Sequence, residues 1–84
     1  MPRRTFNPST KIKFDLTVDA KVKLIVYYML GKEIIRLVNN EFRSVGRYSE
    51  NFNGSSLSSG VYFYRLETEG EKNLNLTKRM VLLK

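Results

Sequence analysis

Short runs of alternating apolar and polar residues, separated by regularly spaced glycines, constrain this chain more than any other feature of its sequence. The glycines fall at positions 31, 46, 54, 60 and 70. The runs between them have the period of two residues that is typical of half-buried strands, whereas an amphipathic helix needs a period of 3.6. The sequence therefore predicts an all-β fold, an antiparallel sandwich of two sheets.

The runs divide into six predicted strands, with room for a short seventh near Phe6. The link at residues 17–20 is short enough to join the first two strands as a hairpin. Residues 33–38 also suit one face of a helix, but the segment is short, β-branched and without helix caps, so we expect a strand that ends at Asn39-Asn40. The six predicted strands are residues 11–16, 22–28, 33–38, 47–52, 61–66 and 74–83.

Two tyrosines, Tyr48 and Tyr62, each follow a glycine by two residues at the start of a predicted strand. In β-sandwiches a tyrosine at such a corner can donate a hydrogen bond back to the loop that it leaves, where backbone groups need a partner. We therefore interpret Gly46, Tyr48, Gly60 and Tyr62 as structural rather than ligand-binding. Glu50 shares a strand face with Tyr48, and we expect a solvated or salt-bridged carboxylate there rather than a catalytic one.

The residue inventory excludes most catalytic chemistry. The chain has 84 residues, enough for one small domain, and contains no cysteine and no histidine. Thiol catalysis, imidazole catalysis and the usual zinc sites are therefore excluded. A domain of this size also has little room for a catalytic cleft. We expect no enzymatic activity, no metal site and no cofactor.

Membrane and export segments are not evident in the sequence. No apolar run approaches the roughly 20 residues that span a bilayer, and the first residues lack the apolar stretch of a signal peptide. If the domain is exported, we expect the signal for export through the inner membrane to lie outside these 84 residues. The lack of cysteine leaves the redox compartment open.

The net charge of +7 comes from 15 basic and 8 acidic residues that are scattered along the chain. On alternating strands such lysines and arginines fill the outer faces, and on edge strands they discourage pairing with other chains. We therefore expect no binding to nucleic acid. A weak, salt-sensitive attraction to anionic outer-membrane surfaces fits the charge better.

Five motifs stand in order along nearly the whole chain. They are Phe6-Asn7-Pro8 before the first predicted strand, Leu30-Gly31-Lys32 after the second, Gly46-x-Tyr48, Gly60-Val61-Tyr62, and Lys78-Arg79-Met80-Val81-Leu82-Leu83-Lys84. In this order they resemble the type A C-terminal sorting domain of type IX secretion cargo, a family found in the Bacteroidota and related bacteria. The resemblance extends over residues 6–84, and residues 1–5 form a start outside the family pattern.

This resemblance implies an Ig-like β-sandwich of six to seven strands, fused to a larger cargo protein on its N-terminal side. It implies that an outer-membrane translocon and its shuttle protein recognise the domain and that a sortase-like protease then removes it. The protein is expected to pass through the periplasm and to reach the cell surface or the medium. By the same resemblance Gly31 is structural, and recognition rests on Lys78, Met80, Val81, Leu82, Leu83 and Lys84.

The last segment, residues 80–83, is apolar at consecutive positions, where a lone edge strand should alternate. One reading is a strand buried centrally between the two sheets. The other is a strand with one face on the core and the other face docking a receptor. We favour the first reading and keep the second open.

An Ig-like structural or adhesive module of a surface or secreted protein is the alternative function. Such a spacer module would have a similar strand pattern, and it would bind a neighbouring domain or a glycan. It would have no need to stand at the end of its protein, so the position of the domain in the parent protein separates the two functions.

Overall fold

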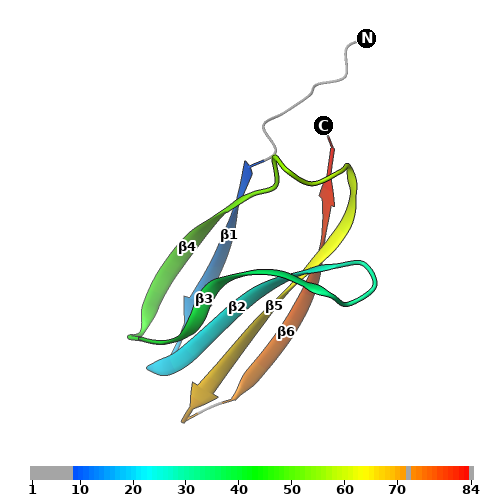
Figure 1. Ribbon diagram of the computed structural model, residues 1–84. Helices are drawn as coiled ribbons and strands as arrows, with labels where there is room; N and C mark the ends of the chain where they lie inside the picture. The colour runs from blue at the N-terminus through cyan, green and yellow to red at the C-terminus, as the bar shows by residue number, and fades with distance from the viewer. Residues whose placement is uncertain (1–8, 72, 84) are drawn as a thin grey trace.

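The computed structural model describes residues 9–71 and 73–83, which form strands and their connections (Figure 1). The all-β prediction is confirmed, whereas the seventh strand near Phe6 falls outside the described residues. Within the described part of the chain no helix is long and apolar enough to cross a membrane. The six strands are β1 (Ser9–Leu16), β2 (Ala20–Tyr28), β3 (Glu33–Arg43), β4 (Gly46–Asn53), β5 (Gly60–Gly70) and β6 (Leu74–Leu82).

The strands form two antiparallel sheets, one with the order β1–β4 and the other with the order β3–β2–β5–β6. The predicted hairpin at residues 17–20 is therefore wrong, because β1 pairs with β4 and β2 pairs with β3 and β5. The link instead crosses between the sheets. Oδ1 of Asp19 accepts a hydrogen bond from the backbone N–H of Val45 over 2.9 Å, which ties this crossing to the β3–β4 connection.

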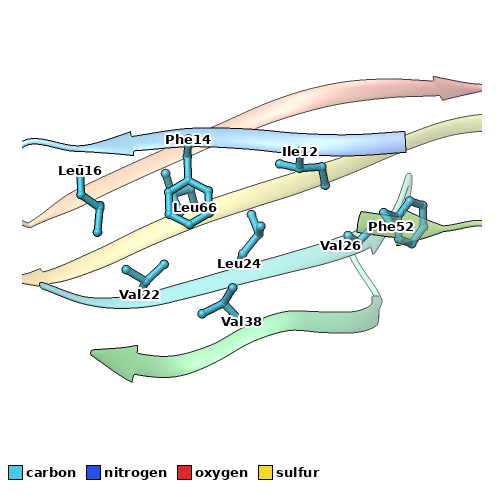
Figure 2. Close-up of a cluster of buried hydrophobic side chains, with 9 residues drawn as sticks. All are labelled: Ile12, Phe14, Leu16, Val22, Leu24, Val26, Val38, Phe52 and Leu66. Atoms are coloured by element: carbon cyan, nitrogen blue, oxygen red, sulfur yellow. The ribbon is translucent and has the colours of Figure 1, made fainter. Parts of the chain in front are cut away.

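One apolar core lies between the two sheets (Figure 2). β1 and β2 each contribute every second residue to it, as the alternation predicts, and the side chains of the two strands face one another. Full burial of an aliphatic side chain stabilises a fold by roughly 1.5–3 kcal/mol relative to exposure. The core residues are Ile12, Phe14, Leu16, Val22, Leu24, Val26, Val38, Phe52 and Leu66.

The third strand continues past the asparagines at which we predicted its end. β3 runs to Arg43, and Asn40 has a φ of 57°, in the left-handed region that asparagine tolerates better than most residues. At this point two residues of β3 lie opposite the single residue Lys23 of β2, which is the arrangement of a β-bulge. The asparagines mark a bulge within the strand, and the prediction of strand rather than helix for residues 33–38 is confirmed.

Glu50 is half-buried on β4 and shares a face with Tyr48 and Phe52, as predicted. Nη2 of Arg43 lies 3.4 Å from Oε2 of Glu50 and 3.1 Å from Oε1 of Glu41, and its guanidinium lies 5.1 Å from the ring centroid of Tyr48. Burial acts to lower the pKa of Arg43, but the hydrogen bonds to the two carboxylates leave that pKa raised. The expectation of a salt-bridged carboxylate at Glu50 is confirmed.

The left-handed backbone at Asn40 predicts how substitutions there change stability. Asn40→Ala should lower the free energy of unfolding by about 1 kcal/mol, because a Cβ without a local hydrogen-bonding group is disfavoured at this φ. Asn40→Gly should leave stability unchanged or raise it. Urea denaturation measures both.

The neighbouring residue provides the control for this prediction. The side chain of Asn39 accepts an exposed hydrogen bond from Nη1 of Arg36 over 3.1 Å, so Asn39→Ala should cost less than about 0.5 kcal/mol. Equal losses for Asn39→Ala and Asn40→Ala would contradict the assignment of the bulge strain to Asn40.

Candidate functional site

The last strand, on which the predicted recognition residues lie, is an edge strand. Within residues 9–71 and 73–83, β6 pairs only with β5; Leu82 is buried in it and Met80 is half-buried. The expectation of a strand buried centrally between two sheets is therefore wrong. The physical reason is the width of the β1–β4 sheet, which has two strands and does not extend over β6. The strand has one face toward the core and the other face exposed, as the second reading requires.

Three of the predicted recognition residues, Lys78, Met80 and Leu82, share the inward face of β6, because side chains alternate along a strand. Leu82 is buried and Met80 packs against the core. Lys78 lines a groove between the sheets beside Leu66. These side chains cannot contact the same partner surface as residues on the outward face.

Val81 and Leu83 are the predicted residues that are open to a partner on the other side. Val81 points outward opposite Val61 of β5, and 57% of its surface is exposed. Leu83, directly after β6, is 50% exposed. Lys84, the remaining predicted residue, lies outside the described residues.

Apolar side chains of β2 and β5 lie on the same outer face of the four-stranded sheet as Val81. Directly opposite residues share a face, so the pairs Val61–Val81 and Tyr27–Phe63 both lie on this side. Met29 follows β2, is 61% exposed, and lines a hollow of about 400 Å³ together with Tyr27 and Phe63. We call these five residues, Tyr27, Met29, Val61, Phe63 and Val81, the outward patch.

Arg65 holds one aromatic ring of the outward patch in place. Its Nη2 donates a hydrogen bond of 2.6 Å to the hydroxyl oxygen of Tyr27, and its guanidinium lies 4.9 Å from the centroid of the same ring. Nε lies 3.1 Å from Oε2 of Glu67, an ion pair without hydrogen-bond geometry. The hydrogen bond to Tyr27 raises the pKa of Arg65, and this bond and the guanidinium–ring contact together orient the ring.

The hairpin tip between β2 and β3 extends the apolar surface beyond the sheet. The N–H of Gly31 donates to the carbonyl of Tyr28 over 2.9 Å, and the N–H of Tyr28 donates to the carbonyl of Lys32 over 2.8 Å. Gly31 has a φ of 98°, which requires glycine. The turn leaves Leu30 94% exposed. The sequence motifs did not single out Met29 and Leu30 as binding residues. The signal that could have indicated them was an apolar pair in a turn, where polar residues are usual.

Tyr62 anchors the loop that leads into β5 beside the outward patch. Its hydroxyl donates a hydrogen bond of 2.6 Å to the carbonyl of Ser58, and the hydroxyl of Tyr48 donates one of 2.6 Å to the carbonyl of Ser44. These are the bonds back to the preceding loop that the sequence pattern predicts. The ring of Tyr62 is buried, and its centroid lies 6.1 Å from that of Tyr28. Tyr62 therefore connects the loop, the last two strands and the hairpin tip.

Comparison with protein families matches residues 7–82 to the family model of the secretion system C-terminal sorting domain. No curated protein and no solved structure gives a significant match. The matched range includes the hairpin tip, the outward patch and β6 as far as Leu82. The geometry described above is therefore part of the region that the family model covers.

The two tyrosine corners predict different costs for the loss of one hydroxyl group. The hydrogen bond from Tyr62 to Ser58 is partly buried, and the one from Tyr48 to Ser44 is exposed. When the hydroxyl group is removed, water can therefore hydrogen-bond to the freed carbonyl of Ser44 but not to that of Ser58. Tyr62→Phe should lower the free energy of unfolding by about 1–1.5 kcal/mol, and Tyr48→Phe by less than about 0.5 kcal/mol. Urea denaturation of the two variants tests this, and a larger loss for Tyr48→Phe would refute the ordering.

Proposed function

The chain belongs to the family of secretion system C-terminal sorting domains, and from this premise we propose that the secretion machinery recognises it as a folded domain, through the outward patch and the end of β6. As a member of this family it is a sorting signal of type IX secretion cargo. The family implies a cargo on its N-terminal side, interaction with the secretion machinery, and export to the surface or the medium. The alternative of a structural or adhesive spacer is not favoured by the match.

The single observation that carries the proposal is the exposure of Met29 and Val81 beside the half-buried side chains of the outward patch, on a well-paired sheet. Val81 is 57% exposed and Met29 is 61% exposed, and both lie at the same end of the four-stranded sheet. Clustered apolar side chains at a surface mark interaction sites, and aromatic and methionine side chains are enriched in the centres of interfaces. A partner therefore needs no unfolding of β6 to reach these groups.

Cations near the outward patch indicate the character of the partner. Arg79 of β6 lies opposite Phe63, and Lys32 lines a second hollow, of about 390 Å³, beside Leu30 and Val61. An apolar centre with a charged rim is the usual anatomy of a specific interface. We expect a partner surface that combines an apolar pocket with acidic residues at its margin.

The proposed partners are the outer-membrane translocon, its shuttle protein and a sortase-like protease. The domain would fold in the periplasm and present the outward patch there before transfer across the outer membrane. The inward side chains of Met80 and Leu82 would hold β6 in register with β5. The outward side chains of Val81 and Leu83 would contact the partner. Lys84 keeps the recognition role that the family resemblance implies.

We further propose that the domain is not an enzyme. Four carboxylates support this, because each lies within 4 Å of an arginine nitrogen and so serves as an ion-pair partner. They belong to Glu33, Glu41, Glu50 and Glu67. In the part of the chain that the structure describes, no group of three acidic side chains could hold a metal ion. These carboxylates support the sheet surface rather than a reaction.

An export assay tests the outward patch directly. A fluorescent protein carrying residues 1–84 is directed to the periplasm of a bacterium with a working type IX system. The double variant Met29→Ser with Val81→Ser removes two exposed apolar contacts, so affinity for the machinery should fall at least tenfold. Fluorescence on the cell surface or in the medium should fall accordingly, while fluorescence in the periplasm rises.

Two other exposed apolar residues supply a matched control. Phe42 is 63% exposed and Val45 is 58% exposed, close to the values for Met29 and Val81, but they lie at the far end of β3 and in the β3–β4 connection. Phe42→Ser with Val45→Ser should leave export unchanged, and circular dichroism verifies that both double variants fold. Equal export by the two double variants would contradict the proposal.

A further inference from the structure

In the part of the chain that the structure describes, no strand covers the inward face of β6 from Leu74 to Lys78. Leu74 and Leu76 lie on this face, opposite Thr68 and Leu66 of β5. The two β5 residues are buried, whereas Leu74 is 42% exposed and Leu76 is 44% exposed. The difference arises because β1 and β4 pack on core residues of β2, β3 and β5, whereas β6 lies on the side of the molecule away from them (Figure 1).

This open margin forms a groove of about 580 Å³ between β1 and β6. Ile12 and Phe14 of β1 line one side, Leu74 and Leu76 of β6 line the other, and Leu66 lies between them. Among residues 9–71 and 73–83 only β4 pairs with β1, so the second edge of β1 faces this groove. An edge strand of this kind offers its backbone N–H and C=O groups to an added strand.

The dimensions of the groove suit one extended segment. Paired strands lie about 4.8 Å apart and packed sheets about 10 Å apart. A strand added beside β1 would therefore lie one strand width further along the small sheet, above β6. Its inward side chains would cover Leu74 and Leu76, which are the apolar groups left open on that strand.

The charges around the groove select the sequence of that segment. Lys13, Arg47 and Lys78 line the groove together with a single acid, Asp15. Lys11 stands on the same outward face of β1 as Lys13. Of these cations, Lys11 and Lys13 belong to β1 itself. Since opposite charges on neighbouring strands stabilise a pair and like charges destabilise it, these two lysines favour acidic residues on the outward face of the added strand.

We propose that the groove between β1 and β6 binds an extended segment of another protein, which adds a strand to β1 and alternates apolar with acidic residues. The apolar residues face Phe14, Leu74 and Leu76, and the acidic residues lie beside Lys11 and Lys13. This groove is on the opposite face of β6 from the outward patch, so the inference does not rest on the proposed recognition surface.

Two other occupants have the wrong charge for this groove. Two copies of the chain paired over most of β1, about Ile12 or Lys13, would bring lysines opposite each other, which is unfavourable. The register about Phe14, which pairs Lys13 with Asp15, would join only residues 12–16. Residues 1–8 contain Arg3 and Arg4 and no acidic residue. A separate acidic segment is the occupant that matches the charge.

The test uses the full chain of 84 residues and synthetic peptides as long as β1. One blocked peptide alternates valine with glutamate, and its control alternates valine with lysine. Titration followed by NMR should show the glutamate peptide shifting the methyl groups of Leu74 and Leu76 and slowing hydrogen exchange of β1 amides. The lysine peptide should cause neither effect, and added salt should weaken the binding.

Charge reversal on β1 provides the matched variants. Lys13→Glu should raise the dissociation constant of the glutamate peptide about tenfold, whereas Lys21→Glu, an exposed lysine on the outer face of β2, should leave it unchanged. If Lys13→Glu perturbs the fold, Leu76→Ser tests the apolar wall instead. Met29→Ser with Val81→Ser should bind the peptide normally, which separates this site from the outward patch.

Four outcomes would overturn the inference. They are equal binding of both peptides, shifts confined to β3, self-association of the free chain that Lys13→Glu abolishes, and slow exchange of all β1 amides before any peptide is added. The third outcome would identify a second copy as the occupant of the groove, and the fourth would identify the chain's own residues 1–8.

Discussion

The two-stranded sheet is too narrow to cover the four-stranded sheet, and the rest of the structure depends on this difference in width. β1 and β4 lie over the middle of the larger sheet and exclude water from Val22, Leu24 and Val26 completely. A domain of this size buries a smaller share of its surface than a large one does, so its stability depends on this one contact. Among residues 9–71 and 73–83, β6 pairs only with β5 and stays exposed along most of its length. The strand on which the proposed recognition residues lie is therefore accessible because the fold leaves it uncovered.

The motifs that are far apart in the sequence meet at one end of the larger sheet. One row across β2, β5 and β6 contains Tyr28 before the hairpin tip, Tyr62 after the corner glycine and Met80 in the last strand. The tilted ring contact between Tyr28 and Tyr62 and the hydrogen bond from Tyr62 to Ser58 fix this row from the inner side. The row joins the hairpin tip that carries Leu30 to the strands that carry the outward patch.

The two faces of β6 differ in chemistry. The outward face of β6 is polar at Asn75, Thr77 and Arg79 and becomes apolar at Val81. That end joins the outward patch, with its ring held by Arg65, and suits a contact that depends on buried apolar area. The inward face opens onto a groove in which apolar walls meet a cationic rim, and suits an extended acidic segment. Exposed edges of this kind invite unwanted pairing, and the lysines on β1 oppose it. One strand can thus serve two contacts without competition between them.

The sequence by itself determined which segments are strands, which side chains face the core, and where the chain must turn at Gly31, because alternation and left-handed backbone are local properties. It also carried the motif order that identifies the family. It could not determine which strands pair. Consecutive strands pair more often than not, so the link between β1 and β2 looked like a hairpin, and Asn39-Asn40 looked like an end because a bulge requires knowledge of the opposite strand.

The position of β6 at an edge, the outward patch and the groove were decided only by tertiary structure. Each depends on contacts between residues far apart in the chain, such as Val61 with Val81 and Phe14 with Tyr48. The apolar run at residues 80–83 was visible in the sequence, but its exposure was not, because exposure depends on how many strands the opposing sheet contains. Met29 and Leu30 became candidates for binding for the same reason. A residue in a turn contributes to a binding surface only when strands that are distant in the sequence lie beside that turn.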